Sequence, residues 1–229
     1  MQTERKVNVV KEKKGIPLET VCLIGCGVQT GVGSVLNTAK VTAGSTVLVM
    51  GLGGVGLSVV QGARIAKAEK IIASDPVKER RSKALKLGAT NVIDPDNDDL
   101  INAVMELTLG KGVDYAFDAV GNSELIALGL TVSKTGGSTV IVGAPPPDEE
   151  LKFPSSLHLM MSEKRLLGSL LGSCNAQKDI PLLVEYWQRD LLDLNNMISQ
   201  TYSLDNINSG IDDLRNSIGI RSVIKIHET

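Results

Sequence analysis

The chain has 229 residues, of which 24 are basic and 26 acidic, so its formal net charge is close to zero. This balance argues against nucleic acid or an anionic membrane surface as a partner. Its three cysteines, an odd number, argue against a disulfide framework and favour a reducing compartment, so we expect a cytoplasmic protein. Residues 1–15 lack the apolar core of a signal peptide, and no apolar run approaches the ~20 residues that span a bilayer.

The first two thirds of the chain alternate short apolar runs with amphipathic stretches, which is typical of βαβ units. We expect strands at residues 45–51, 70–75, 90–94, 113–121 and 138–144, and intervening helices at 53–67, 76–88, 98–110 and 123–137. A sixth strand within 164–173 would complete an α/β fold with a doubly wound parallel six-stranded sheet of the Rossmann type.

Residues beyond this sheet do not continue the βα rhythm. Amphipathic patterns predict helices within 179–192 and 203–217, and the apolar run 221–226 predicts a closing strand. We therefore expect three parts: a loose N-terminal segment at 1–14, a Rossmann domain at 15–175, and a C-terminal segment at 176–229 that packs elsewhere.

A glycine-rich turn joins the first predicted strand to the first predicted helix. The spacing Gly-x-Gly-x-x-Gly fits a dinucleotide-binding loop, because the glycines allow a tight turn, close approach of a pyrophosphate, and close helix–strand packing. The N–H groups at the start of the helix would then meet the phosphates. The residues concerned are Gly51, Leu52, Gly53, Gly54, Val55 and Gly56.

Such a loop predicts an acidic residue about 20 positions further on, and Asp75 stands there at the end of the second predicted strand. Its carboxylate would accept the ribose hydroxyls of an adenosine and repel a 2′-phosphate, so NAD is favoured over NADP. The alternative role for Asp75 is to cap the following helix. Lys78, Arg80 and Arg81 keep NADP open, because an arginine can pair with that phosphate.

The segment 22–33, CLIGCGVQTGVG, contains Cys22 and Cys26 within an apolar run. On its own it is compatible with a metal site, a redox pair or a buried turn. For Cys22 we expect a small buried apolar side chain. Cys174 lies in a predicted loop and has no evident partner, and we expect His158 and His227 at the surface.

Several longer stretches together resemble the zinc-dependent, medium-chain alcohol dehydrogenase family. They are PLETVCLIGCGVQTGVGSVLNTAKV, GSTVLVMGLGGVGLSVVQGARIA, FDAVGN, IVGAPP and SIGIRSVIKI, and their order and spacing extend over nearly the whole chain. The resemblance is strongest to the branch that holds the animal-type and glutathione-dependent enzymes.

The resemblance implies hydride transfer between NAD and an alcohol or aldehyde, with zinc polarising the substrate oxygen. It makes Cys26 a ligand of the catalytic zinc and places Thr30 beside the nicotinamide. It also assigns Arg221 to the pyrophosphate and Arg80 to the neighbourhood of the adenosine. Five further residues would border the nicotinamide: Ala119, Val120, Val142, Gly143 and Ala144. A homodimer would form through residues 149–170.

The matching stretches cover only the coenzyme-binding part of the family, so we expect this chain to lack the GroES-like substrate domain. That domain would supply the other catalytic zinc ligands, and residues 176–229 would normally complete it. Three hypotheses stay open: a coenzyme-binding part with little turnover alone, a half-enzyme completed by a separately encoded chain, and a non-catalytic dinucleotide-binding or sensing module.

Overall fold

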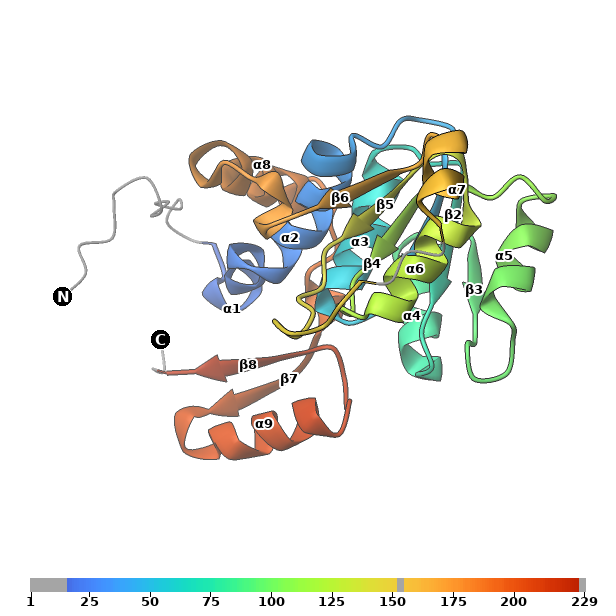
Figure 1. Ribbon diagram of the computed structural model, residues 1–229. Helices are drawn as coiled ribbons and strands as arrows, with labels where there is room; N and C mark the ends of the chain where they lie inside the picture. The colour runs from blue at the N-terminus through green and yellow to red at the C-terminus, as the bar shows by residue number, and fades with distance from the viewer. Residues whose placement is uncertain (1–15, 152–154, 227–229) are drawn as a thin grey trace.

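The computed structural model describes residues 16–151 and 155–226, and it consists of a parallel sheet with helices on both faces and a smaller C-terminal lobe (Figure 1). The strands of the main sheet are β1 Thr46–Met50, β2 Lys70–Ser74, β3 Asn91–Ile93, β4 Val113–Asp118, β5 Ser133–Ile141 and β6 Arg165–Gly168. The helices up to β6 are α1 Leu18–Val21, α2 Gly27–Gly33, α3 Gly54–Ile65, α4 Lys78–Leu87, α5 Leu100–Leu107, α6 Ser123–Val132 and α7 Ser156–Met161.

The strand order is β3-β2-β1-β4-β5-β6, and every neighbouring pair is parallel. The chain thus starts in the middle of the sheet, winds to one edge, and then returns to the other side, which confirms the predicted doubly wound Rossmann fold. The carboxyl ends of β1, β2 and β4 meet at one edge, where such folds place their ligands.

Alternation along the strands divides the core between the two faces of the sheet. Val47 and Val49 of β1 contribute to one apolar cluster, which also contains buried side chains of α2, α3 and α4. Leu48 and Met50 contribute to a second cluster, with buried residues of α5. Because both faces of the sheet are covered, β1, with the sequence TVLVM, is a nearly continuous apolar run and does not alternate between apolar and polar residues.

One predicted boundary is wrong. The sequence pattern predicts a helix through residue 137, but α6 ends at Val132 and β5 begins at Ser133, opposite Val113 of β4. Two adjacent glycines, Gly136 and Gly137, lower the helical propensity of this stretch, and pairing with β4 is the stronger interaction.

The C-terminal part begins with α8, Ala176–Gln188, whose Leu183 and Val184 are buried in the same core as α2 and α3. A small βαβ unit follows: β7 Ile198–Ser203, α9 Ile207–Arg215 and β8 Arg221–Lys225, with the two strands parallel. In Figure 1 this unit lies apart from the main sheet. We did not predict β7. The division at residue 175 stays a prediction.

Within the described residues, no single helix is long and apolar enough to cross a membrane. One bent pair, Leu18–Gly25 with Gly27–Ala39 at 52°, meets the requirement by length and composition alone.

Candidate dinucleotide site

The glycine loop turns the chain from β1 into α3 at the carboxyl edge of the sheet. Gly51 has a φ of +87°, a conformation that side chains rarely adopt. A methyl group on Gly56 would overlap the carbonyl oxygen of Gly51, so the helix packs directly on the turn. At Gly53, by contrast, an added methyl group would meet nothing within 4 Å. Gly53 therefore leaves open space in front of the first N–H groups of α3.

Asp75 follows β2 and reaches back to this loop. Its Oδ2 accepts a hydrogen bond from the N–H of Leu52 at 2.7 Å, and its Oδ1 accepts one from the N–H of Val77 at 2.8 Å. The residue is only 4% exposed. Val77 is the N-cap residue of α4. Asp75 therefore accepts the N–H of the N-cap residue itself and does not cap an N–H of the first helical turn. Each carboxylate oxygen keeps a further lone pair.

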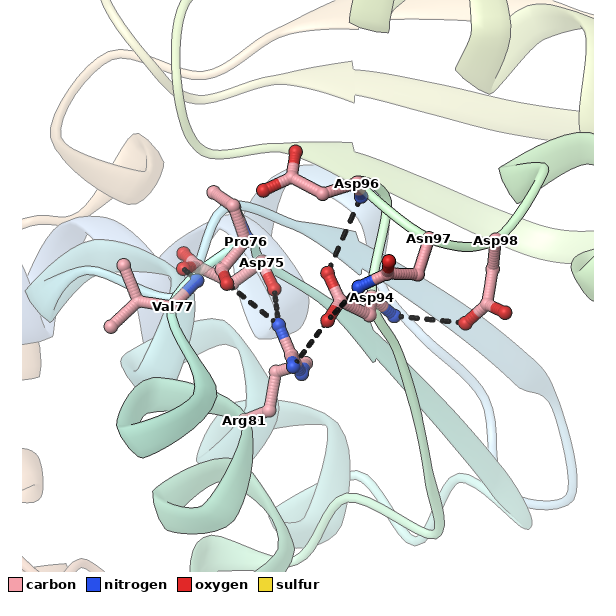
Figure 2. Close-up of polar contacts among 8 residues, drawn as sticks. All are labelled: Asp75, Pro76, Val77, Arg81, Asp94, Asp96, Asn97 and Asp98. Atoms are coloured by element: carbon pink, nitrogen blue, oxygen red, sulfur yellow. Dashed lines mark hydrogen bonds and ion pairs between the residues drawn. The ribbon is translucent and has the colours of Figure 1, made fainter.

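Arg81 serves the turn after β2. Its Nη1 donates to the carbonyl oxygens of Asp75 at 2.7 Å and Pro76 at 2.8 Å, while Nη2 pairs with Asp94 at 2.6 Å (Figure 2). Asp94 is in turn bonded within its own loop, by the N–H of Asp96. Both terminal nitrogens of Arg81 are therefore already bonded, to the backbone around Asp75 and to Asp94.

Arg80 points the other way, toward the C-terminal lobe. Its Nη1 lies 3.9 Å from Asp75 Oδ2, and its Nη2 donates to the carbonyl oxygens of Ser217 and Gly219 at 3.2 and 3.4 Å. The two consecutive arginines of α4 thus both contact Asp75, but Arg81 also pairs with Asp94, whereas Arg80 bonds to the loop before β8.

Arg221, the first residue of β8, lies against the start of α3 although it belongs to the C-terminal lobe. A methyl group on Gly54 or on Gly27 would overlap its guanidinium group. The two glycines therefore provide room for a positive charge beside the helix N-terminus. Nothing in the local sequence around Arg221 predicts this contact, because it joins segments more than 150 residues apart.

Thr30 lies on α2, which packs closely against α3. It is 8% exposed. The close packing depends on Gly31, where a methyl group would overlap the carbonyl oxygen of Val55 and the side chain of Ser58.

The loops after β4 and β5 meet at the same edge of the sheet. The N–H groups of Val142 and Gly143 both donate to the carbonyl oxygen of Asp118 at 2.9 Å. A methyl group on Gly143 would overlap the backbone of Val120 and Gly121, and a methyl group on Gly51 would overlap Val120 Cγ2. Ala119 N–H donates to the carbonyl oxygen of Met50. The structure therefore brings these two loops to the glycine loop.

Asp118 organises the loop after β4, a role that we did not predict from the sequence. Its fully buried carboxylate accepts hydrogen bonds from the N–H groups of Val120 at 3.0 Å, Gly121 at 3.1 and 3.2 Å, and Asn122 at 3.4 Å. Burial raises the pKa of this carboxyl, against the opposing effect of the backbone N–H groups. The available signal was an acid at the carboxyl end of a strand, after the apolar residues Ala116 and Phe117.

The cysteines differ from their predictions in two respects. Cys22 is exposed, not buried: in the short 3₁₀ turn that it begins, Leu23 and Ile24 are the buried side chains, and the Sγ of Cys22 bonds to the carbonyl oxygen of Glu19 at 3.2 Å. Cys174 does have partners: its Sγ lies 3.4 Å from Gln29 O and 3.5 Å from Asn37 Nδ2. Burial raises the pKa of the Cys174 thiol to about 11. His158 is exposed, as expected, and His227 lies outside the described residues.

A protein-family model described as zinc-binding dehydrogenase matches residues 54–188, which is more than half of the chain. The chain belongs to the zinc-binding dehydrogenase family. Alcohol dehydrogenase 6 of Rattus norvegicus is 39% identical to it over 226 residues, which cover 96% of this chain. The chain spans 59% of the length of the curated relatives that it matches.

Solved structures of similar proteins share the fold over nearly the whole chain. The benzyl alcohol dehydrogenase from Acinetobacter calcoaceticus superimposes with a TM-score of 0.93 at 35% identity, covering 97% of this chain and 61% of that one. A Sinorhizobium meliloti protein solved bound to NADP gives a TM-score of 0.75 at 27% identity and covers 88% and 58% of the two chains.

For a zinc-binding dehydrogenase, this chain offers few metal ligands. Cys26 is exposed and lines a cavity of about 220 Å³ together with Cys22, Gly27 and Arg221. No group of three or more His, Cys, Asp and Glu residues that could hold a metal ion occurs within residues 16–151 and 155–226. A catalytic zinc needs three protein ligands and an open position. The described residues therefore do not form a complete zinc site.

Proposed function

We propose that this chain binds NAD(H) as the coenzyme-binding part of an alcohol dehydrogenase, which transfers hydride between the coenzyme and an alcohol or aldehyde. The observation that carries the proposal is the pairing of Asp75 with the N–H of Leu52. It joins the acid after β2 to the glycine loop after β1, and dinucleotide-binding folds have an acid at this position that accepts the ribose hydroxyl groups.

In this proposal the phosphates meet the N–H groups that begin α3, in the space that Gly53 leaves open. Arg221 adds a positive charge from the side of Gly54. Asp75 accepts the adenosine ribose hydroxyls with the lone pairs that its two backbone bonds leave free.

The nicotinamide would lie between α2 and the loops after β4 and β5. Thr30 and Val120 would contact it from two sides, and residues 142–144 would border it. The coenzyme, when bound, supplies the hydride or accepts it. The side chains named here orient the ring and exclude water.

NAD is the proposed coenzyme, not NADP. A 2′-phosphate would meet the carboxylate of Asp75, and the neighbouring Arg81 is already committed to Asp94 and to two backbone carbonyl groups. Because the Sinorhizobium meliloti protein was solved bound to NADP, the affinities of this chain for the two coenzymes should be compared directly.

Cys26 is proposed as one zinc ligand, with the remaining ligands supplied by residues other than those described here. Assignment to the animal-type and glutathione-dependent branch is also proposed, on the sequence stretches that resemble it. A homodimer through residues 149–170 is also proposed: β6 is an edge strand, and beside it Leu157, Met160 and Met161 of α7 are exposed. We place the protein in the cytoplasm, on its unpaired cysteines.

Two measurements on the 229-residue chain test this function. NADH fluorescence titration reports coenzyme binding, and an assay with NAD, zinc and a series of primary and aromatic alcohols reports turnover. We expect NADH binding with little turnover. Turnover by the chain alone would show that it needs no further zinc ligands, and a folded chain without affinity for NADH would contradict the proposal.

A further inference from the structure

Arg221 lies against Gly54 at the start of α3, and Arg80 lies near Asp75, which bonds to the glycine loop. Arg80 donates both bonds of its Nη2 to the carbonyl oxygens of Ser217 and Gly219, in the loop 216–220 that joins α9 to β8. That loop leads directly into Arg221. The bonds from Arg80 therefore fix the backbone two and four residues before the side chain that covers the helix N-terminus.

Besides the bonds from Arg80, the loop 216–220 is bonded locally to the end of α9: the N–H groups of residues 216, 217 and 218 donate to the carbonyl oxygens of Asp212, Leu214 and Asp213. A cavity of about 470 Å³, lined by Arg80, Lys83 and the loop itself, lies between α4 and the loop. Ser217 and Gly219 both have positive φ angles, at +57° and +72°, which costs energy at the non-glycine position. A second anchor is the N–H of Ile220, which donates to Ser199 Oγ at 2.9 Å. The bonds to α9 are local, so the loop should open more easily when its bonds from Arg80 on α4 are removed.

The guanidinium group of Arg80 also lies near Asp75, the acid that bonds to the glycine loop. Arg80 Nη1 lies 3.9 Å from Asp75 Oδ2, the oxygen that accepts the N–H of Leu52. The glycine loop thus bonds to Asp75, Asp75 lies near Arg80, and Arg80 bonds to the loop 216–220. Arg221, which follows that loop, lies against Gly54 at the end of the glycine loop. Arg80 Nε is buried and has no hydrogen-bond partner among the described residues. The position of Arg80 is therefore set by these partners at its two terminal nitrogens.

We propose that Arg80 is a positioning residue, which holds Arg221 over the N-terminus of α3, and is not itself a contact of the adenosine ribose. The proposal rests on the proposed coenzyme binding. Its consequence is that the affinity for NADH depends on Arg80 only as long as Arg221 is present.

A double-mutant cycle tests this dependence. Arg221→Met should weaken NADH binding on the order of 10- to 100-fold, because it removes a charged partner of the phosphates. Arg80→Met should weaken it on the order of 10-fold, and Arg80→Lys should recover part of the loss with a single ammonium group. The double variant should match Arg221→Met alone to within about threefold. Losses that multiply in the double variant would overturn the proposal.

Two further measurements keep the test independent of folding and of the proposed function. Lys83→Met is the matched control, since Lys83 lines the same cavity one turn further along α4, and its NADH affinity should equal that of the wild type. Amide hydrogen exchange should accelerate at residues 219–221 in Arg80→Met but not in Lys83→Met, with unchanged melting temperatures. If the wild-type chain does not bind NADH, the proposed function fails, and the hydrogen exchange alone decides whether Arg80 anchors the loop. Unchanged exchange in Arg80→Met contradicts the inference.

Discussion

Asp75 holds Leu52: the carboxylate that follows β2 accepts the backbone N–H at the tip of the glycine loop at 2.7 Å. The loop conformation and the position of the acid are therefore fixed together, before any ligand arrives. A preorganised site of this kind loses less conformational entropy on binding.

Asp75→Ala should weaken NADH binding by about 1–3 kcal/mol, because charge-assisted hydrogen bonds to the ribose are lost together with the anchor of the loop. Fluorescence titration measures the effect. Asp96→Ala is the control, since Asp96 is an exposed acid two residues after Asp94 and far along the chain from the glycine loop. Equal NADH affinity in Asp75→Ala and the wild type would show that the carboxylate only orders the backbone before α4.

Two glycines of the same loop should respond differently to a methyl group. Gly56→Ala creates an overlap with the Gly51 carbonyl oxygen and should lower the free energy of unfolding by about 1–3 kcal/mol. Gly53→Ala meets nothing within 4 Å and should leave the free energy of unfolding within about 1 kcal/mol of the wild-type value, yet weaken NADH binding. Urea unfolding and NADH titration of both variants separate the two effects. A Gly53→Ala variant with full NADH affinity would contradict the phosphate position.

Asp118 should make stability depend on pH in an unusual direction. Its pKa is raised in the folded protein, so the folded state favours the protonated carboxyl more than the unfolded state does. The contribution of Asp118 to the free energy of unfolding is therefore largest below its unfolded pKa and decreases as pH rises through the folded pKa.

The comparison with Asp118→Asn isolates this contribution from those of the other carboxylates. Urea unfolding between about pH 4 and pH 8 should give a wild-type-minus-variant difference that becomes smaller as pH rises. A difference that grows with pH would show that the backbone N–H bonds outweigh the burial of the carboxylate.

Cys26→Ser should leave NADH affinity unchanged within about twofold, because the thiol lines a cavity beside Arg221 and does not bond to the glycine loop. Zinc bound per chain, measured by atomic absorption, should decrease if Cys26 is a ligand. Cys22→Ser is the matched control, as an exposed thiol at the same cavity that we do not assign to zinc. Zinc content that falls in Cys22→Ser and not in Cys26→Ser would contradict the ligand assignment.

The sequence predicts the main sheet well because its signals are local. The strands β1 and β2 are short, largely apolar runs, TVLVM and KIIAS, and Gly51–Gly56 marks the turn where a strand becomes a helix. The strand β7 was missed because its sequence, ISQTYS, shows no apolar run, and its stability comes from pairing with β8 some 20 residues later. The early start of β5 at Ser133 depends likewise on its partner, Val113.

The residues of the candidate site also fall into two groups: those that a local sequence signal identifies, and those whose contacts depend on the packing of distant segments. The spacing from the glycine loop identifies Asp75, but its bonds to Leu52 and Val77 follow from the packing of β1 beside β2. The exposure of Cys22 depends on a 3₁₀ turn that apolar composition does not reveal. The contact of Arg221 with Gly54 joins two distant segments, so only the family resemblance pointed to it.

Calorimetric titration of the 229-residue chain with NADH, and then with NADPH, tests the central claim most directly. We expect one NADH site per chain, with NADPH bound at least 10-fold more weakly because its 2′-phosphate meets Asp75. A chain that is folded by circular dichroism and takes up neither coenzyme would contradict the account.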